Sequence, residues 1–278
     1  RSCHPPITVP AWAVMATSKT PGELGMYGFR HRRPGDYDSF YLVTSRNLRE
    51  PTLWDLAARS GKRSVLIAFP PSYPPPKVRG WLVSDFHTPS DAERYTHPPW
   101  LKLEVERIAG GPFIHDIKFR IEDRASVMTS LFKMTSQHLR VAEHLARAKK
   151  WDLFWYVEIG LDRMHHAFWK YFDPGHPRHV PDSPFSDVAR RYYSMLDEGI
   201  KRLIEAAPDA VVVVVSDHGA KAMEGAFALN EWLADNGYLA MEERPPPGTD
   251  LPRAKVDWDR TLVWGWGGYY ARLFVNLR

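Results

Sequence analysis

Cysteine is almost absent from this chain, with Cys3 the single thiol among 278 residues. One thiol excludes an internal disulfide framework, and the lack of a Cys-x-x-Cys pair excludes a thiolate zinc site of that kind. A strong excess of charge of one sign is missing too, because 37 Lys and Arg stand against 33 Asp and Glu. The longest basic clusters are residues 31–33 and 149–150, so we expect no nucleic-acid-binding motif.

Long hydrophobic runs are also missing. The apolar run at residues 210–215 is far shorter than the roughly 20 residues of a membrane span, and residues 11–16 are too few for a secretory signal. We therefore expect no membrane span and no signal peptide in this sequence, and a cytoplasmic location. Because the chain opens at Arg1 without an initiator Met and closes at Arg278 on a strand-like stretch, we expect a piece of a longer protein, incomplete at both termini.

What is present is an ordinary globular composition, 44% hydrophobic and 25% charged. The pattern of apolar residues predicts helices over residues 11–17, 51–59, 125–149, 183–207 and 229–234, and strands over residues 64–69, 81–86, 151–159, 210–215 and 269–277. This alternation predicts an α/β fold with a mostly parallel central sheet flanked by helices. We expect residues 1–278 to form a single α/β catalytic-type domain, with a cap-like insert at about residues 71–150.

Two acidic clusters follow predicted strands. Asp162 and His166 come after residues 151–159, and Asp217 and His218 come directly after residues 210–215. Carboxylate and imidazole are good ligands for Zn²⁺ or Mn²⁺, and ligands in open α/β sheets bind outside the carboxyl ends of the strands. Either cluster alone is more simply explained as a helix cap or turn. The two together predict a metal site.

Thr8 stands just before the predicted helix at residues 11–17. A hydroxyl in that place meets free backbone N–H groups and the positive end of the helix dipole, which suits a nucleophile that attacks a phosphoryl group. The alternative is that Thr8 only caps the helix.

Several motifs occur in a fixed order along the chain. Thr-Val-Pro-Ala-Trp at residues 8–12 is followed by Pro-Gly-Glu-Leu-Gly-Met-Tyr-Gly-Phe at 21–29, by Asp-Arg-Met-His-His-Ala-Phe-Trp at 162–169 and by Ser-Asp-His-Gly at 216–219. Further matches lie at residues 51–54, 73–76 and 230–233. Together these motifs resemble the type I phosphodiesterase/nucleotide pyrophosphatase family of the alkaline phosphatase superfamily, over nearly the whole chain.

This resemblance implies an alkaline-phosphatase-like fold and a site with two divalent metal ions, zinc in the first place and manganese as the alternative. Thr8 would be the nucleophile and would form a phosphothreonine intermediate. Asp217 and His218 would bind the ion that activates Thr8, and Asp162 and His166 would bind the second ion. The two ions would clamp the in-line displacement from both sides.

The chain also departs from the family pattern. The family has one more Asp ligand on a strand upstream of the nucleophile and one more His ligand downstream, and neither position falls within residues 1–278. The Asn of the nucleotide-cleaving members falls near Phe29 and is absent.

We therefore predict a metal-dependent phosphoric ester hydrolase of the phosphodiesterase type, acting on a small-molecule phosphate ester. One alternative is a phosphomonoesterase or phosphomutase of the same superfamily. Another is a non-catalytic module that binds a phosphorylated ligand. The sequence leaves the oligomeric state open.

Overall fold

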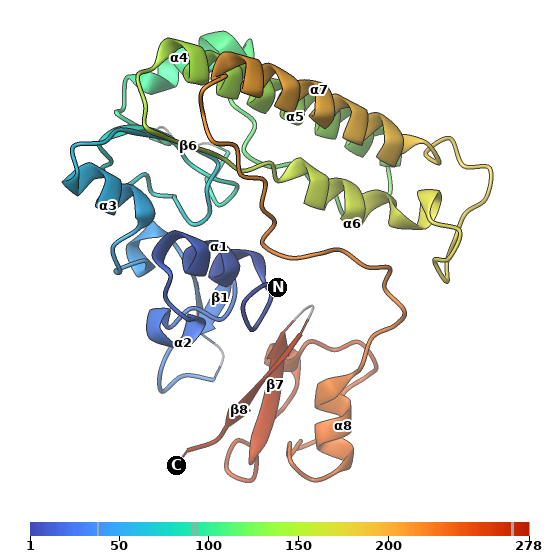
Figure 1. Ribbon diagram of the computed structural model, residues 1–278. Helices are drawn as coiled ribbons and strands as arrows, with labels where there is room; N and C mark the ends of the chain where they lie inside the picture. The colour runs from blue at the N-terminus through green and yellow to red at the C-terminus, as the bar shows by residue number, and fades with distance from the viewer. Residues whose placement is uncertain (38, 91, 93, 268–269, 278) are drawn as a thin grey trace. The chain divides into compact units, whose positions relative to one another are not determined.

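The computed structural model describes residues 1–37, 39–90, 92, 94–267 and 270–277. The chain divides into two compact units, Arg1–Ala222 and Met223–Arg278, which are described separately. The first unit contains a four-stranded sheet with helices on both faces, and the second contains a hairpin and one longer helix (Figure 1).

The sheet of the first unit is mostly parallel, as the sequence predicts. Strands β3 (Ser64–Ile67), β4 (Gly80–Val83) and β6 (Leu153–Tyr156) run parallel, and β5 (Thr96–His97) pairs antiparallel with β4 at one edge. The strand order is β5-β4-β3-β6. All four side chains of β3 are buried, which is typical of a parallel strand covered on both faces.

Helices cover the two faces of this sheet with separate apolar clusters (Figure 1). On one face, Val65 and Ile67 pack against α4 (Leu101–Ala109) and α5 (Arg124–Ala148). On the other face, Leu66 packs in one cluster with Trp12 of α1 (Thr8–Thr17) and Trp54 of α3 (Leu53–Arg59). Because successive side chains of a strand point to opposite faces, adjacent residues of β3 serve both clusters. The fold is therefore a layered α/β arrangement.

A third cluster joins α5 to two further helices, α6 (Gly160–Phe172) and α7 (Val188–Ala206). Leu131 of α5, Phe168 of α6 and Tyr192 of α7 are buried in it. The remaining elements of this unit are short: α2 (Pro21–Leu24), η1 (Ser45–Asn47) and the antiparallel pair β1 (Arg30–Arg32) and β2 (Phe40–Leu42).

The second unit contains α8 (Leu229–Asp235), η2 (Leu251–Arg253) and the antiparallel strands β7 (Val263–Gly267) and β8 (Ala271–Val275). The side chain of Asn230 ties α8 to β7: its Nδ2 donates to Gly265 O at 2.9 Å, and its Oδ1 accepts from Gly265 N at 2.7 Å. A side chain at Gly265 would press on the end of the Leu229 side chain of α8, which would have to shift.

Most predicted elements are confirmed with shifted ends. The helix predicted at 11–17 begins at Thr8, the one predicted at 183–207 begins at Val188, and the last predicted strand forms over Ala271–Val275, with residue 269 outside the described residues. The sequence did not predict α2, α4, α6, β1, β2, β5 or β7.

The strand predicted over residues 210–215 is wrong for this structure, which assigns no strand there. The valines of the run are exposed, from 47% at Val215 to 92% at Val211. A β-branched run has high strand propensity, but a strand exists only where a neighbour completes its hydrogen bonds, and no described strand pairs with this run.

Residues 71–150 contain β4, β5, α4 and α5. The single catalytic-type domain and the cap-like insert stay predictions. None of the helices in the described part of the chain is long and apolar enough to cross a membrane.

Candidate active site

Thr8 is the first residue of α1 and is almost fully buried, with 8% of its surface exposed. The capping position belongs to Ile7, which has extended backbone angles (φ −120°, ψ 141°). The sequence alternative in which Thr8 caps the helix is therefore wrong. Instead, Thr8 Oγ1 lies 3.1 Å from Nε2 of His218, a residue 210 positions away in sequence. The hydroxyl also lies at the positive end of the α1 dipole.

The hydrogen bonds of His218 indicate which of its two ring nitrogens carries the hydrogen and which one has a lone pair directed at Thr8. Nδ1 lies 2.9 Å from Gly219 O, an acceptor, so Nδ1 carries the hydrogen. In the neutral ring Nε2 is then the unprotonated nitrogen, and it faces both Thr8 Oγ1 and, at 3.3 Å, Asp217 Oδ2. Burial raises the pKa of Asp217 above its usual value, and the nearby charge of Asp162 acts in the same direction.

The second pair lies in the first turns of α6. Nε2 of His166 is 3.3 Å from Oδ1 of Asp162, one helical turn apart as the spacing in the sequence predicts. Burial tends to raise the pKa of Asp162, but the hydrogen bond and charge of His166 and the charges of Arg163 and His218 outweigh it, so this pKa is lowered. Asp162 is therefore a carboxylate held in its ionised form.

The structure brings the five predicted site residues into one neighbourhood. Thr8 contacts His218 directly, and the two pairs are close enough for the charge of Asp162 to raise the pKa of Asp217. The five residues come from three parts of the chain. Thr8 lies in α1, Asp162 and His166 lie in α6, and Asp217 and His218 lie in an irregular segment before residue 222.

The donor chemistry of this neighbourhood fits a divalent cation. The lone pair of His218 Nε2 and the carboxylate of Asp217 are both acceptors and lie 3.3 Å apart, an arrangement that a cation between them would stabilise. Among the described residues no group of three or more His, Cys, Asp and Glu side chains gathers as an ion site. Each pair thus offers two ligand atoms to an ion, and water or substrate oxygens would have to supply the remaining ligands of that ion.

Sequence reasoning missed the residues that hold Asp162 in place. Arg163 donates from Nη1 to Asp162 Oδ2 at 2.7 Å and grips Asp116 with two bonds, Nε to Oδ1 at 2.8 Å and Nη2 to Oδ2 at 2.7 Å. The ring of Phe119 lies 4.5 Å from the guanidinium and stacks on His166 at 5.5 Å. Only the position of Arg163 beside Asp162 could have indicated this, because Asp116 and Phe119 lie in a segment without periodic pattern.

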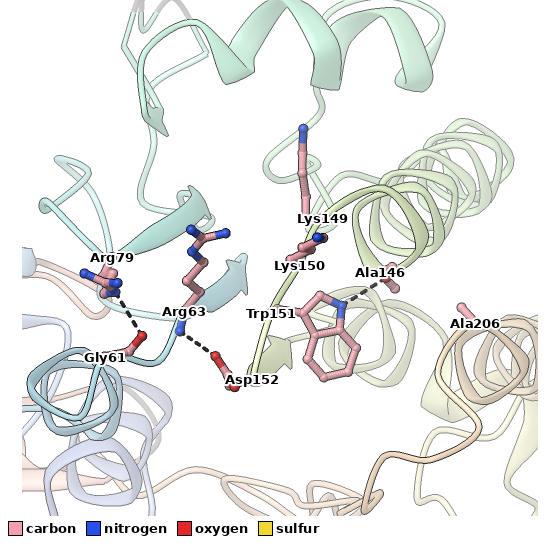
Figure 2. A pocket seen from close by; sticks show the side chains of 9 residues that line it. All are labelled: Gly61, Arg63, Arg79, Ala146, Lys149, Lys150, Trp151, Asp152 and Ala206. Carbon is pink, nitrogen blue, oxygen red and sulfur yellow. Dashed lines mark hydrogen bonds between the residues drawn. The ribbon is translucent and has the colours of Figure 1, made fainter.

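A cavity of about 550 Å³ lies elsewhere in the first unit (Figure 2). It is lined by Gly61, Arg63, Arg79, Ala146, Lys149, Lys150, Trp151, Asp152 and Ala206. Arg63, Arg79 and Asp152 directly precede β3, β4 and β6, so the cavity is at the amino-terminal edge of the parallel strands. Asp162 instead follows the carboxyl end of β6. None of the five candidate residues lines this cavity, and it is separate from the site around Thr8.

Comparison with known proteins gives one match. The family model described as type I phosphodiesterase / nucleotide pyrophosphatase matches residues 1–273. That range includes Thr8, both carboxylate–imidazole pairs and most of the second unit. No curated protein and no solved structure matches the chain.

Proposed function

The chain belongs to the type I phosphodiesterase/nucleotide pyrophosphatase family, within the alkaline phosphatase superfamily, and we propose that it hydrolyses phosphodiesters with Thr8 as the nucleophile. The members of this family are hydrolases of phosphate esters, which supports an enzyme. The substrate we propose is a small-molecule phosphate ester.

The observation that carries this proposal is the contact between Thr8 Oγ1 and His218 Nε2 at 3.1 Å. A buried hydroxyl that faces an imidazole lone pair has a partner for its proton and leaves an oxygen lone pair for attack. The ring itself is oriented through Nδ1 by Gly219 O. Such a constellation is the usual form of an activated nucleophile.

The proposed reaction has two steps. In the first, Thr8 Oγ1 gives its proton to His218 Nε2 and forms a bond to phosphorus. The bond from phosphorus to the leaving alcohol oxygen breaks and that oxygen takes up a proton, so that a phosphothreonine that keeps the other alcohol results. In the second, water forms a bond to that phosphorus and the bond from phosphorus to Thr8 Oγ1 breaks, so that the phosphate monoester leaves and Thr8 takes up a proton to recover its hydroxyl. The N-terminus of α1 presents its backbone N–H groups to the phosphoryl oxygens.

We propose further that Asp217 with His218, and Asp162 with His166, hold two divalent ions, zinc or manganese. With an ion on His218 Nε2, the proton of Thr8 would pass to solvent instead of to the ring. When bound, these ions supply Lewis acidity that lowers the pKa of the Thr8 hydroxyl and neutralises phosphoryl charge. Arg163 and Asp116 fix the orientation of Asp162 whether or not an ion is present.

Turnover of a chromogenic phosphodiester and the matching monoester by the zinc- or manganese-loaded protein tests the proposal. We expect Thr8→Ala to lower kcat/KM for the diester by at least about 10³-fold, because the nucleophile is lost. Thr129→Ala is the matched control, since Thr129 is an exposed residue of α5 whose hydroxyl donates within its own helix, to Ala125 O.

Three other outcomes of these assays would change the proposed function. A preference for the monoester would replace the diesterase assignment by the phosphomonoesterase or phosphomutase alternative. Equal turnover by wild type and Thr8→Ala would reject Thr8 as the nucleophile. No turnover of either ester with either metal would favour a non-catalytic module that binds a phosphorylated ligand.

A further inference from the structure

The loop that follows β4 contains a buried carboxylate–imidazole pair outside the five candidate residues. Asp85 is fully buried, and its Oδ1 lies 2.7 Å from Nδ1 of His87 and accepts the backbone N–H of His87 at 2.6 Å. Its other oxygen accepts from the backbone N–H and, at 3.3 Å, the hydroxyl of Ser72. A carboxylate with these donors fixes the hydrogen of the imidazole on Nδ1 and leaves Nε2 as the atom directed elsewhere.

That second nitrogen has no hydrogen-bond partner among the described residues, although it is buried. The side chain of His87 is only 10% exposed, so bulk water does not satisfy it either. The neighbours on its ring faces are apolar: the ring of Phe86 stacks on it at 4.3 Å, and the ring of Phe29 lies at 5.9 Å. Buried polar atoms without a partner are rare and call for a ligand or a specific role.

His87 lies at the edge of the sheet where the candidate active site is. It follows β4 by four residues, and Asp162 follows the parallel strand β6, so both leave the carboxyl ends of their strands at the same edge. Phe86 contacts the guanidinium of Arg163 at 5.2 Å, and Arg163 in turn binds Asp162.

A second series of contacts leads from His87 to the helix that carries the proposed nucleophile, Thr8. Phe29 packs against the cluster that contains Val9, the residue next to Thr8. The two aromatic neighbours of His87 thus connect it with the helix that carries Thr8 on one side and with the helix that carries Asp162 on the other.

We propose that Nε2 of His87 binds a hydroxyl on the organic group of the substrate. This inference rests on the proposed function and specifies its substrate class: a phosphodiester whose alcohol part bears a free hydroxyl. A hydroxyl both donates and accepts, so it pairs with Nε2 in the neutral ring and in the protonated ring alike. A phosphoryl oxygen only accepts and would not satisfy the neutral ring. Phe29, which is half-buried and lies in the loop between α2 and β1, is the neighbour that has to give way.

A purely structural role makes a different prediction. If the Asp85–His87 pair only holds the loop after β4, its loss lowers turnover of all substrates to the same extent. If His87 binds a substrate hydroxyl, its loss affects only substrates that carry one, because a site built to bond a hydroxyl discriminates strongly against analogues without it.

Two diesters that differ in one hydroxyl separate these cases: 4-nitrophenyl 3-hydroxypropyl phosphate and 4-nitrophenyl propyl phosphate. With the zinc-loaded full chain, and with release of nitrophenol by Thr8→Ala subtracted as background, we expect wild type to prefer the hydroxylated ester by at least 10-fold in kcat/KM. We expect His87→Phe to lower the value for this ester at least 10-fold and to leave the propyl ester within about 2-fold.

His144→Phe is the matched control. His144 is also a histidine paired with a carboxylate, Glu104 at 2.8 Å, but it lies near the C-terminal end of α5 and should leave both rates unchanged. His87→Gln, which keeps hydrogen-bonding atoms, should retain part of the preference.

Equal rates for the two esters in wild type would overturn the inference even if His87→Phe failed to fold. An equal loss on both esters in His87→Phe would overturn it in favour of the structural role. If Thr8→Ala cleaves both esters as fast as wild type, the proposed function itself fails and the inference falls with it.

Discussion

Arg163 binds two carboxylates at once, Asp116 through a bidentate pair and Asp162 through a single bond. Its side chain is buried against the rings of Phe86 and Phe119. A guanidinium has donors in a fixed fork, so it can set the angle of Asp162 in a way that a lysine could not. Part of what orients the candidate ligand Asp162 is therefore a set of residues that take no part in the proposed chemistry.

Arg163→Ala should lower the free energy of unfolding by about 3 kcal/mol, because it leaves two half-buried carboxylates without their cation. It should also lower turnover, because Asp162 loses its orientation. Urea unfolding and kcat/KM of the same preparation would measure both effects.

A double-mutant cycle with Asp116→Ala tests the explanation. Once Asp116 is gone, Arg163→Ala should cost measurably less than it does in the wild type, since the bidentate pair no longer exists. Strict additivity of the two losses would contradict a direct interaction.

At the scale of elements, the junction between β6 and α6 positions Asp162 and His166. Glu158 lies in this junction and accepts hydrogen bonds from Thr135 of α5 at 3.2 Å, Tyr192 of α7 at 3.2 Å and the backbone N–H of Gly160 at 2.7 Å. The hydroxyl of Tyr156 in β6 donates to its other oxygen. One carboxylate therefore links the strand and three helices at the start of α6.

Gly160→Ala should disturb this junction, because a Cβ there would lie 2.6 Å from both Glu158 Oε1 and Thr135 Oγ1. We expect a loss of about 1–3 kcal/mol in unfolding free energy together with a loss of turnover, since α6 must shift.

Gly199→Ala in α7 is the comparison variant. Its Cβ would meet the flexible end of Leu139 at 2.5–2.6 Å, far along the helix from the junction. It should lower stability, as thermal unfolding would show, with kcat/KM unchanged. Equal losses of activity in the two variants would mean that the junction has no special role.

At the scale of the whole molecule, histidines buried in the first unit make its stability depend on pH. Burial lowers the pKa of His115 to about 4, the charge of His138 adds to the effect, and the bond to Ser84 O opposes it. The unfolded chain, with a pKa near 6.5, binds more protons between those two values. Stability therefore falls as the pH falls from about 6.5 to about 4.

The expected size of this contribution is about 3 kcal/mol, from roughly 2.5 pKa units at 1.36 kcal/mol each. Urea unfolding of wild type and His115→Asn at pH 7 and pH 4.5 measures it. The variant should lose less stability on acidification than wild type does. The same loss in both proteins would assign the acid sensitivity to other groups.

Much of the architecture follows from local pattern. The helix over Arg124–Ala148 and the parallel strands β3, β4 and β6 are confirmed near their predicted positions, because helical apolar periodicity and short apolar runs leave a direct trace in the sequence. The residues 210–215 show the limit of this reasoning. Their valines favour a strand, yet these side chains are exposed and no strand forms here. Propensity alone is not sufficient, because a strand forms only where a neighbouring strand pairs with it.

The candidate site, like the fold, has some features that the sequence predicts and others that only the tertiary structure decides. The sequence by itself determined the fold class, the family and the residues to examine, because motif order and residue chemistry are properties of the chain. Only the tertiary structure decided that Thr8 meets His218 across 210 positions, that Asp116 holds Arg163, and that Nε2 of His87 is buried without a partner. These are contacts between segments far apart in sequence, and no local propensity or spacing records which distant side chains folding brings together.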